Sequence, residues 1–343
     1  MNYVSCPITI LIDKERDRSS SIYWFDHLPQ IRIGSLMELS WTTNKVITLI
    51  RLLRLEHALP PNGALVTMQN SRLTQMVLLL ACVRAIKRPI IVLELNLKWS
   101  ISSSWERYLA RFLYRRAAVL TVLAPSDRDL LIREARISDA KVKVLDQWAQ
   151  PDRFAEICSP RIQSILNKIG PDYIVSAGRS SRKIEDLFKA LLGLPQVRAI
   201  IIGEAEECVP DSLRERVKAI PSLRLDEYIY LLRRAKACVI ALQQVDHTCG
   251  VRVWFQSVAV GTPVIITATE PVKYYASKAL LAYLYEPGDT NKLSDHIASL
   301  MLNNQTRLDF IMQTKNSLCD LFSPEEYDSN LADLLSKLPL FHP

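Results

Sequence analysis

The sequence predicts a chain of two α/β domains, each built on a parallel β-sheet that helices cover on both faces. Its 343 residues exceed what one ordinary hydrophobic core organises. Short apolar runs alternate with helical patterns, and this alternation starts twice, before and after a stretch of weak periodicity at about 147–160. We therefore expect one domain over 1–150, a second over 151–323, and a helical ending over 324–343.

In the first half, the candidate strands are continuous apolar runs, as parallel strands buried on both faces require. They are 7–13, 64–68, 90–95, 119–124 and 141–145. Helical patterns at about 71–87 and 104–117 lie between them. A further helix, DRDLLIREA, has Ser126 and Asp127 as candidate caps.

The second half repeats this pattern. The candidate strands are 173–178, 197–203, 237–242 and 263–269, and the candidate helices lie near 181–192, 225–236, 251–260 and 289–302. A last helix is expected at about 324–337. Ligands of such sheets bind outside the carboxyl ends of the strands, so the segments that follow the strands are the first candidates for a site.

The amino-acid composition limits the class of protein and the kinds of partner that it can bind. A hydrophobic share of 49% excludes a disordered or fibrous chain. The formal net charge of +7 attracts anions, which leaves nucleic acid, an acidic membrane surface and a phosphorylated small molecule open, beside a plain solvated basic surface.

Cysteine and histidine usage bears on the compartment and on metals. Seven cysteines without C-x-x-C spacing indicate free thiols in a reducing compartment, and five scattered histidines give no metal-ligand spacing. The first residues read as a strand rather than a signal peptide, and no apolar run is long enough to span a bilayer. We expect a cytoplasmic protein without a bound metal.

The segment SAGRSSRKIEDLFKAL, residues 176–191, carries the first chemical signal. Three cations, Arg179, Arg182 and Lys183, lie between a strand end and a helix that Ser180 or Ser181 can cap. Helix N–H groups and guanidinium groups together favour a diphosphate. A solvated basic turn is the alternative.

The segment CGVRVWFQSVAVGTPVIITAT, residues 249–269, carries the second signal. Gly250 opens a helix, and Arg252 and Gln256 share one of its faces because they are one turn apart. The alternative is an ordinary turn between a helix and a strand of a Rossmann-like domain.

Taken together, the two segments resemble the C-terminal domain of GT-B glycosyltransferases close to family 4. GRSSRK at 178–183 is similar to the GRSxRD of a subset of that family, and AVGTPVI at 259–265 is similar to its A-x-G-x-P-V-I. EPGD at 286–289 is similar to its PGD pattern, so the resemblance covers about 170–302. It implies a GT-B fold, with two Rossmann-like doubly wound domains facing across a cleft and a C-terminal helix returning to the first.

The resemblance also implies roles for single residues. Arg179 and Lys183 would be catalytic by stabilising the leaving diphosphate, with Arg182 as an alternative second cation. The implied donor site comprises Gly178, Arg179, Ser180, Arg182, Lys183, Gly203, Thr248, Cys249, Gly250, Val251, Arg252 and Gln256. Thr248 and Gln256 stand where the family has the two acids of a Glu-x7-Glu motif, and Gln256 can still hydrogen-bond ribose hydroxyls.

The expected function is sugar transfer from a UDP- or GDP-sugar to a sugar or lipid-linked acceptor, as in polysaccharide or glycolipid synthesis. The resemblance implies retention of configuration without a metal or cofactor. The two missing acids leave open a non-catalytic protein that binds a nucleotide sugar or a partner. A nucleic-acid-binding protein is the other alternative, but no such motif is present.

Two features of the first half point to further partners. Glu94 and Asn96 follow a strand on the acceptor side, where a carboxylate could orient an acceptor hydroxyl, although a surface glutamate at a strand end is the alternative. The helix over 102–118 places Trp105 and Phe112 at helical spacing beside several arginines. Such a helix can lie peripherally on an anionic membrane at its inner face, or it is a core helix with an arginine-rich solvent face.

Overall fold

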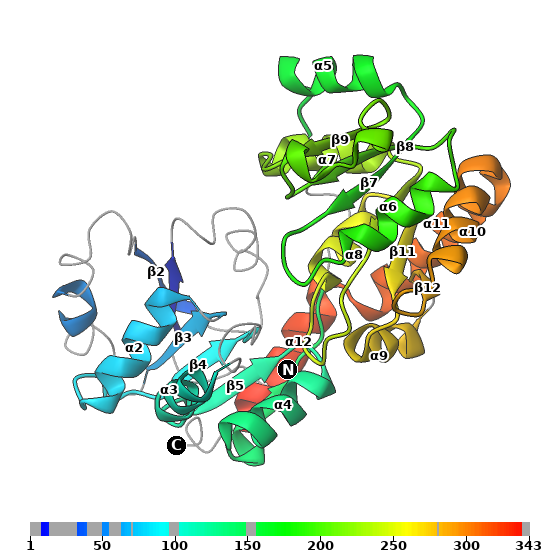
Figure 1. Ribbon diagram of the computed structural model, residues 1–343. Helices are drawn as coiled ribbons and strands as arrows, with labels where there is room; N and C mark the ends of the chain where they lie inside the picture. The colour runs from blue at the N-terminus through cyan, green and yellow to red at the C-terminus, as the bar shows by residue number, and fades with distance from the viewer. Residues whose placement is uncertain are drawn as a thin grey trace. The chain divides into compact units, whose positions relative to one another are not determined.

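The chain divides into two compact units. The computed structural model describes residues 8–13, 33–39, 50–54, 63–69, 71–95, 103–148, 156–279 and 281–337 (Figure 1). One unit comprises 1–146 with 324–343, and the other comprises 147–323. Among the described helices, none is long and apolar enough to cross a membrane.

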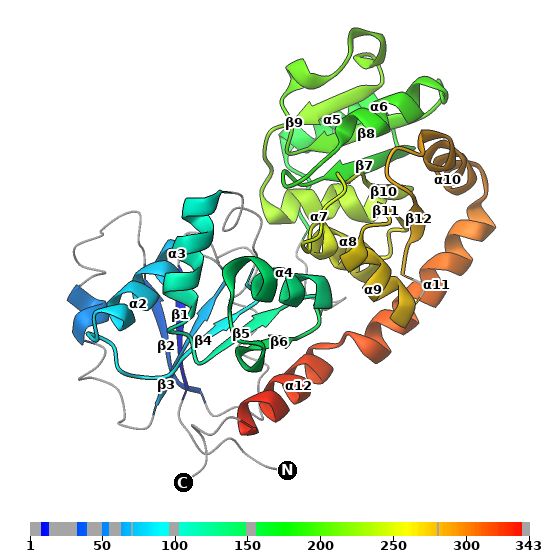
Figure 2. The same ribbon diagram turned by 60° about the horizontal axis from the view of Figure 1, so that its bottom comes forward.

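The first unit contains a six-stranded sheet in the order β2-β1-β3-β4-β5-β6, with every neighbouring pair parallel. Its strands are β1 (Ile8–Asp13), β2 (Ile33–Leu39), β3 (Ala64–Met68), β4 (Ile90–Leu93), β5 (Val119–Val122) and β6 (Val142–Val144). Its helices include α2 (Arg72–Cys82), α3 (Ser104–Tyr114), α4 (Pro125–Ala135) and α12 (Pro324–Ser336). Figure 2 draws α12 in red; it belongs to this unit although it follows the second unit in sequence.

The second unit contains another parallel sheet, in the order β12-β11-β10-β7-β8-β9. Its strands are β7 (Tyr173–Ala177), β8 (Arg198–Ile202), β9 (Val217–Ile220), β10 (Ala237–Ile240), β11 (Val264–Thr267) and β12 (Tyr283–Tyr285). Its helices are α5 (Pro160–Ile169), α6 (Ile184–Leu192), α7 (Leu225–Arg234), α8 (Val251–Ala259), α9 (Glu270–Lys278), α10 (Thr290–Leu302) and α11 (Asn304–Leu321). The chain reverses its direction of progress across the sheet between β7 and β10, the order found in dinucleotide-binding folds.

The second sheet is buried on both faces because its strands alternate between two apolar layers. Tyr173 and Val175 of β7 point into one layer, which includes α8 and α9, whereas Ile174 points into the other, which includes α6 and α10. This accounts for strands without a polar face, and it leaves the strand ends as the places where polar groups gather.

The start of one helix in the first unit differs from the sequence expectation. The prediction that Ser126 or Asp127 caps a helix was wrong, because α4 already begins at Pro125 with Ala124 in the cap position and no side-chain cap bond. Proline suits that first position, since its missing N–H would have no partner within the helix.

The orientation of α3 also differs from one expectation. Its buried side chains are Ala110, Leu113 and Tyr114, whereas Trp105 and Phe112 are exposed. The alternative of a core helix with an arginine-rich solvent face is therefore confirmed in part: α3 packs on the core of the first unit, but Trp105 and Phe112 lie on its exposed side. The arginine face is mixed, because Arg115 and Arg116 are exposed but Arg107 and Arg111 are half-buried.

The core of the second unit depends most visibly on Trp254 of α8. Its side chain is fully buried, its indole N–H donates to the Leu281 carbonyl at 2.8 Å, and its ring meets those of Phe255 and Tyr275 edge-on. We expect Trp254→Ala to lower the free energy of unfolding by about 3–5 kcal/mol, because it opens a large cavity and leaves a buried carbonyl without its donor.

Urea unfolding followed by circular dichroism measures this loss. Leu302→Ala is the matched control, since Leu302 is 75% exposed and its truncation should change stability by less than about 0.5 kcal/mol. Equal losses in the two variants would contradict the assignment of Trp254 to the core.

Candidate functional site

The candidate site lies at the carboxyl edge of the second sheet, where β7 and β10 are neighbours. The segment 178–183 follows β7, and the segment 241–250 follows β10 and leads into α8. These strands flank the point at which the strand order reverses, which is where open α/β sheets bind ligands. The topology thus brings together the two segments that carry the chemical signals of the sequence.

Direct hydrogen bonds fasten the two segments to each other. The Lys183 amide donates to the Ala241 carbonyl at 3.1 Å, and the Gln243 amide donates to the Ser181 carbonyl at 2.9 Å. The Cys249 thiol donates to the Ser180 carbonyl at 2.8 Å. The turn after β7 is therefore fixed relative to the start of α8.

The serines of the turn do not cap the helix that follows. Helix α6 begins at Ile184 with Lys183 in the cap position and without a side-chain cap bond, so the prediction that Ser180 or Ser181 caps it was wrong. A capping residue directly precedes the first helical residue, and the turn places two further residues between Ser181 and α6. Ser181 has a left-handed backbone with φ 51°, and its hydroxyl lies 3.5 Å from His247 Nε2.

Arg182 turns inward beneath the two segments. Its Nε and Nη2 donate to the Ala177 carbonyl at 3.0 and 2.7 Å, and its Nη1 is buried without a hydrogen-bond acceptor in the part of the chain that the structure describes. The thiols of Cys249 and Cys238 and the hydroxyl of Tyr228 also lie close enough to interact electrostatically with it.

The environment of Arg182 leaves its charge uncompensated. No carboxylate forms an ion pair with Arg182 within the described residues. Burial lowers the pKa of its guanidinium, but arginine keeps its proton in proteins, so the group is a buried cation. Burying an ion costs several kcal/mol, and a bound anion nearby would offset part of that cost.

Two glycines leave the space that this guanidinium occupies. Gly178 has φ 111°, and a Cβ placed on it would lie 2.0 Å from Arg182 Nη2. Gly250 has φ 75°, and a Cβ there would lie 3.2 Å from Nη1 and 2.8 Å from Ile240 Cγ2. Any larger residue would collide at both positions and would also strain the backbone.

The other two cations of the turn lie differently. Arg179 is exposed, and its Nη2 donates to the Pro221 carbonyl beyond β9 at 2.6 Å. The Lys183 ammonium lies 3.3 Å from a carboxylate oxygen of Asp186, which is itself buried. The Arg179 guanidinium therefore lies along the carboxyl edge of the sheet near the end of β9, whereas the Lys183 ammonium is paired with the nearby Asp186 carboxylate.

Gly203, at the end of β8, belongs to the same edge. A Cβ on Gly203 would lie 2.8 Å from the Gly178 carbonyl and 3.1 Å from Arg179 Cγ. The turn after β7 thus passes directly over the end of β8.

The start of α8 supplies the second side of the site. Gly250 is the N-cap, Thr248 and Cys249 are buried just before it, and Val251 is buried just after it. The first N–H groups of a helix have no partner within the helix, so this end attracts negative charge.

Arg252 and Gln256 are half-buried one turn apart on α8. Within the described residues, the Gln256 amide forms no side-chain hydrogen bond, so both its donor and its acceptor are available to a ligand.

Sequence reasoning missed His247 and Tyr228. His247 lies three residues before Gly250, so its place in the loop that leads to α8 was a usable signal. Tyr228 lies on α7, far from both motifs in sequence, and only the fold brings its hydroxyl close to Arg182.

The acceptor-side candidates lie in the first unit. Glu94 follows β4 with φ 50°, is 1% exposed, and its amide donates to Thr121 Oγ1 at 2.9 Å. The alternative of a surface glutamate was therefore wrong. Asn96 lies outside the described residues.

Among the described residues, no group of three or more His, Cys, Asp or Glu side chains is placed to hold a metal ion. The carboxyl edge of the second sheet does offer cations, backbone N–H groups and neutral polar side chains, and groups of these kinds recognise phosphate oxygens.

Comparison with known proteins agrees with this geometry. Residues 161–317 match the family described as glycosyl transferases group 1, a span that includes the whole candidate site of the second unit. No curated protein matches the chain in sequence.

Several solved structures share the fold. HepE from Anabaena, in a complex with UDP-glucose, is 16% identical, with a TM-score of 0.70 over 97% of this chain and 100% of that one. Sucrose-phosphate synthase from Thermosynechococcus elongatus is 16% identical, with a TM-score of 0.68 over 97% and 99%. A glycosyltransferase from Rickettsia africae is 10% identical, with a TM-score of 0.67 over 98% and 99%.

The likeness extends over nearly the whole length of each of these chains, so it establishes the GT-B fold predicted from the two motifs. With the family match over residues 161–317, the second unit carries a glycosyl transferases group 1 domain in a chain of GT-B fold.

Proposed function

We propose that the protein transfers a sugar from a nucleotide-sugar donor to an acceptor hydroxyl, with the donor diphosphate held between the 178–183 turn and the start of α8. The observation that carries this proposal is the buried Arg182 guanidinium, which has no carboxylate partner among the described residues and lies against two glycine turns. A buried cation close to the start of a helix, whose first N–H groups have no partner within the helix, favours a ligand with concentrated negative charge.

In this proposal Arg179 and Lys183 are the catalytic cations. Exchange of the Pro221 carbonyl for a phosphate oxygen would give Arg179 a stronger, charge-assisted contact. Lys183 would stabilise the charge that develops on the leaving diphosphate, and Arg182 would reinforce both from below. The proposed donor site comprises these cations with Gly178, Ser180, Gly203, Thr248, Cys249, Gly250, Val251, Arg252 and Gln256.

Thr248 and Gln256 take the positions where the family has acids. We assign Gln256 to the ribose hydroxyls, because its amide is half-buried on the α8 face beyond Gly250 and can both donate and accept. Neutral groups here avoid placing a negative charge beside a diphosphate. Because HepE was solved with UDP-glucose, a UDP-sugar is the first donor to test, with a GDP-sugar as the second.

The finer features of the reaction are part of the proposal. Retention of configuration without a metal follows the family resemblance, since cations and helix N–H groups can stabilise the leaving group. The acceptor would be a sugar or a lipid-linked sugar in polysaccharide or glycolipid synthesis. The protein would be peripheral and would bind this acceptor at the inner face of a membrane. Buried Glu94 of the first unit is the residue proposed to orient the acceptor hydroxyl.

A second candidate is a non-catalytic protein that binds the nucleotide sugar, favoured by the replacement of both family acids at Thr248 and Gln256. Incubation with radiolabelled UDP-glucose and GDP-mannose separates the two. Transfer to added acceptors, or slow donor hydrolysis, supports the enzyme. Donor binding without either product supports the second candidate.

Donor binding itself is measured by thermal shift. We expect UDP at a hundredfold excess over its dissociation constant to stabilise the protein by about 2.7 kcal/mol, and uridine at the same concentration much less. Equal shifts for the nucleoside and the nucleotide would contradict a diphosphate site.

Substitutions of Arg179 and of Gln256 should affect the two ligands differently. We expect Arg179→Ala to weaken UDP binding by about 1.5–3 kcal/mol and to leave uridine binding nearly unchanged, because only UDP carries the phosphates. Gln256→Ala should weaken both ligands, since both carry ribose. Isothermal titration of the two variants with the two ligands checks this, and equal losses of both ligands in both variants would mean that the pocket is misassigned.

Arg182 should matter more for binding than for stability. We expect Arg182→Gln to weaken UDP binding by about tenfold or more while changing the free energy of unfolding by less than about 1 kcal/mol. The loss of two hydrogen bonds to Ala177 and the removal of an uncompensated buried charge act in opposite directions.

Urea unfolding without ligand and titration with UDP measure the two quantities separately. Arg198→Gln is the control, because Arg198 also donates to a backbone carbonyl, that of Ile169, at the opposite edge of the sheet. If Arg182→Gln loses several kcal/mol of stability and keeps its affinity for UDP, Arg182 is a structural residue only.

A further inference from the structure

Helix α3 of the first unit exposes an aromatic stripe. Trp105, Tyr108 and Phe112 are 68%, 61% and 47% exposed, and their spacing of three and four residues places them along one face. The rings of Trp105 and Tyr108 stack with centroids 5.8 Å apart. Three adjacent large aromatic residues on one helix exceed the scattered apolar exposure that is normal for a protein surface.

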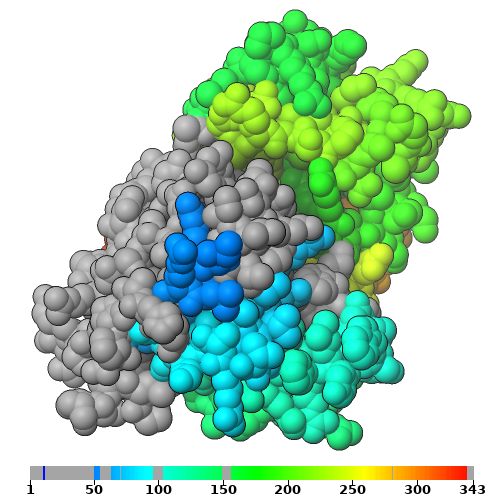
Figure 3. All heavy atoms as spheres, turned by 90° about the vertical axis from the view of Figure 1, so that its left-hand side faces the viewer, coloured from blue at the N-terminus to red at the C-terminus, as the bar shows by residue number. Residues whose placement is uncertain are grey.

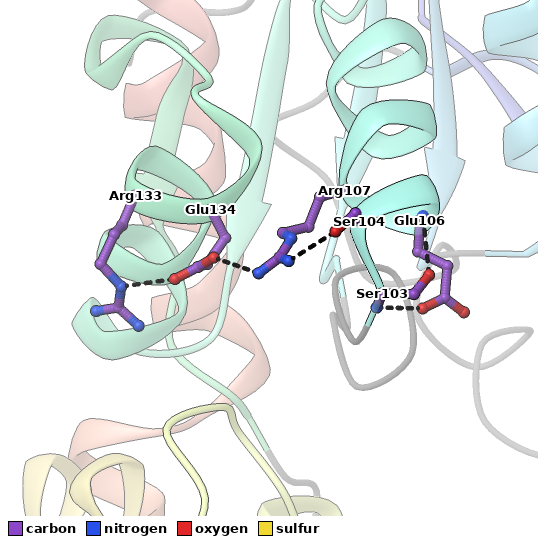
Figure 4. A network of polar contacts seen from close by, with 6 residues as sticks. All are labelled: Ser103, Ser104, Glu106, Arg107, Arg133 and Glu134. Carbon is purple, nitrogen blue, oxygen red and sulfur yellow. Dashed lines mark hydrogen bonds and ion pairs between the residues drawn. The ribbon is translucent and has the colours of Figure 1, made fainter.

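The helix that carries the stripe is held firmly. Ser103 and Glu106 form a reciprocal capping box at its start, with bonds of 3.1 and 2.8 Å (Figure 4). Arg107 donates to Glu134 of α4 at 3.1 Å and to Ser104 at 3.2 Å, and Arg133 donates to the other oxygen of Glu134 (Figure 4). The aromatic side chains are thus presented by a fixed scaffold rather than by a loose segment.

Positive charge borders the stripe. Residues 103–118 contain four arginines and one glutamate, and that glutamate is occupied in the capping box. Arg111 and Arg115 lie one turn apart beside Tyr108, and Arg116 follows on the surface. The exposed face of α3 therefore carries the aromatic stripe beside the half-buried Arg111 and the exposed Arg115 and Arg116.

The end of α2 extends the same surface. The Cys82 thiol of α2 points to the Phe112 carbonyl at 3.7 Å, so the two helices adjoin there. The next residues, Val83 and Arg84, are exposed, Val83 by 66%. Figure 3 shows the segments of α2 and α3, in cyan and blue-green, next to each other on one face of the first unit.

We propose that this face of α3, with the end of α2, is the docking surface for an anionic lipid bilayer. Trp105, Tyr108 and Phe112 would enter the interfacial zone, where aromatic rings are favoured, and the arginines would contact lipid phosphates. A second copy of the chain fits this face less well, because a two-fold contact would bring the arginines of both copies together. The inference rests on the membrane placement within the proposed function, whereas donor binding is tested separately because the donor residues lie in the other unit.

Co-sedimentation with vesicles tests the proposal. Vesicles of phosphatidylcholine alone are compared with vesicles that also contain phosphatidylglycerol, at low and at high salt. We expect binding only to the anionic vesicles at low salt. Arg111→Gln with Arg115→Gln should reduce this binding by about 30-fold, from the usual contribution of about a factor of five per arginine near an anionic surface.

The aromatic stripe is tested by Trp105→Ser, Tyr108→Ser and Phe112→Ser combined. This variant should lose about tenfold or more in vesicle binding, because the three rings no longer enter the interface. Leu302→Ser with Met312→Ser is the matched control, since these side chains of the second unit are 75% and 61% exposed, and it should bind like the unchanged protein.

A second measurement follows Trp105 directly. Anionic vesicles should shift tryptophan emission to the blue, and Trp105→Phe should remove most of that shift while vesicle binding persists. Circular dichroism and the UDP-induced thermal shift are recorded on every variant, so that a loss of fold or of donor binding is distinguished from a loss of docking.

Three results would overturn the proposal. One is equal binding of the unchanged protein to neutral and anionic vesicles, or to neither. Another is full vesicle binding by the triple serine variant. The third is a dimer in light scattering that the triple serine variant converts to a monomer, which would assign the face to a second copy.

Discussion

The guanidinium of Arg182 can remain in the interior only because two glycines leave the space that it fills. One glycine ends the strand β7 and the other begins the helix α8, so the cation also sets the spacing between the two segments that form the site. Its two bonds to the Ala177 carbonyl tie that spacing to the sheet itself. The position of the helix N–H groups relative to Arg179 and Lys183 follows from this arrangement.

Much of the fold could be predicted from the sequence, because buried parallel strands are continuous apolar runs. Strands β7, β8, β10 and β11 were found this way, and so was the helix that leads from Gly250. Strand β9 was missed, because at the edge of the sheet it carries Lys218 between apolar residues and so lacks a continuous apolar run. Helix α5 was missed, although Ile162, Ile165 and Ile169 have the spacing of a buried helical face and Ser159 caps its start.

The candidate site was predictable in its location but not in its geometry. Three cations within five residues indicate an anion-binding site. Their position between a strand end and a helix start indicates where in the fold that site lies. Which cation turns inward depends on the left-handed backbone of Ser181 and on space left by Gly250, more than sixty residues away. A local sequence pattern cannot contain this information. For the same reason, the exposure of Trp105 and Phe112 could not be predicted from the spacing of residues within α3, because it depends on how α3 packs against its neighbours.

The thiols beside Arg182 have a chemical consequence of their own. Burial raises the pKa of Cys238 to about 11, so at neutral pH only about one molecule in ten thousand carries the reactive thiolate there. Cys158, Cys208 and Cys319 are exposed in the same unit. An alkylating reagent that needs a thiolate would therefore modify the surface cysteines first. While the unit stays folded, mild oxidants would likewise leave the buried Cys238 thiol beside Arg182 unmodified.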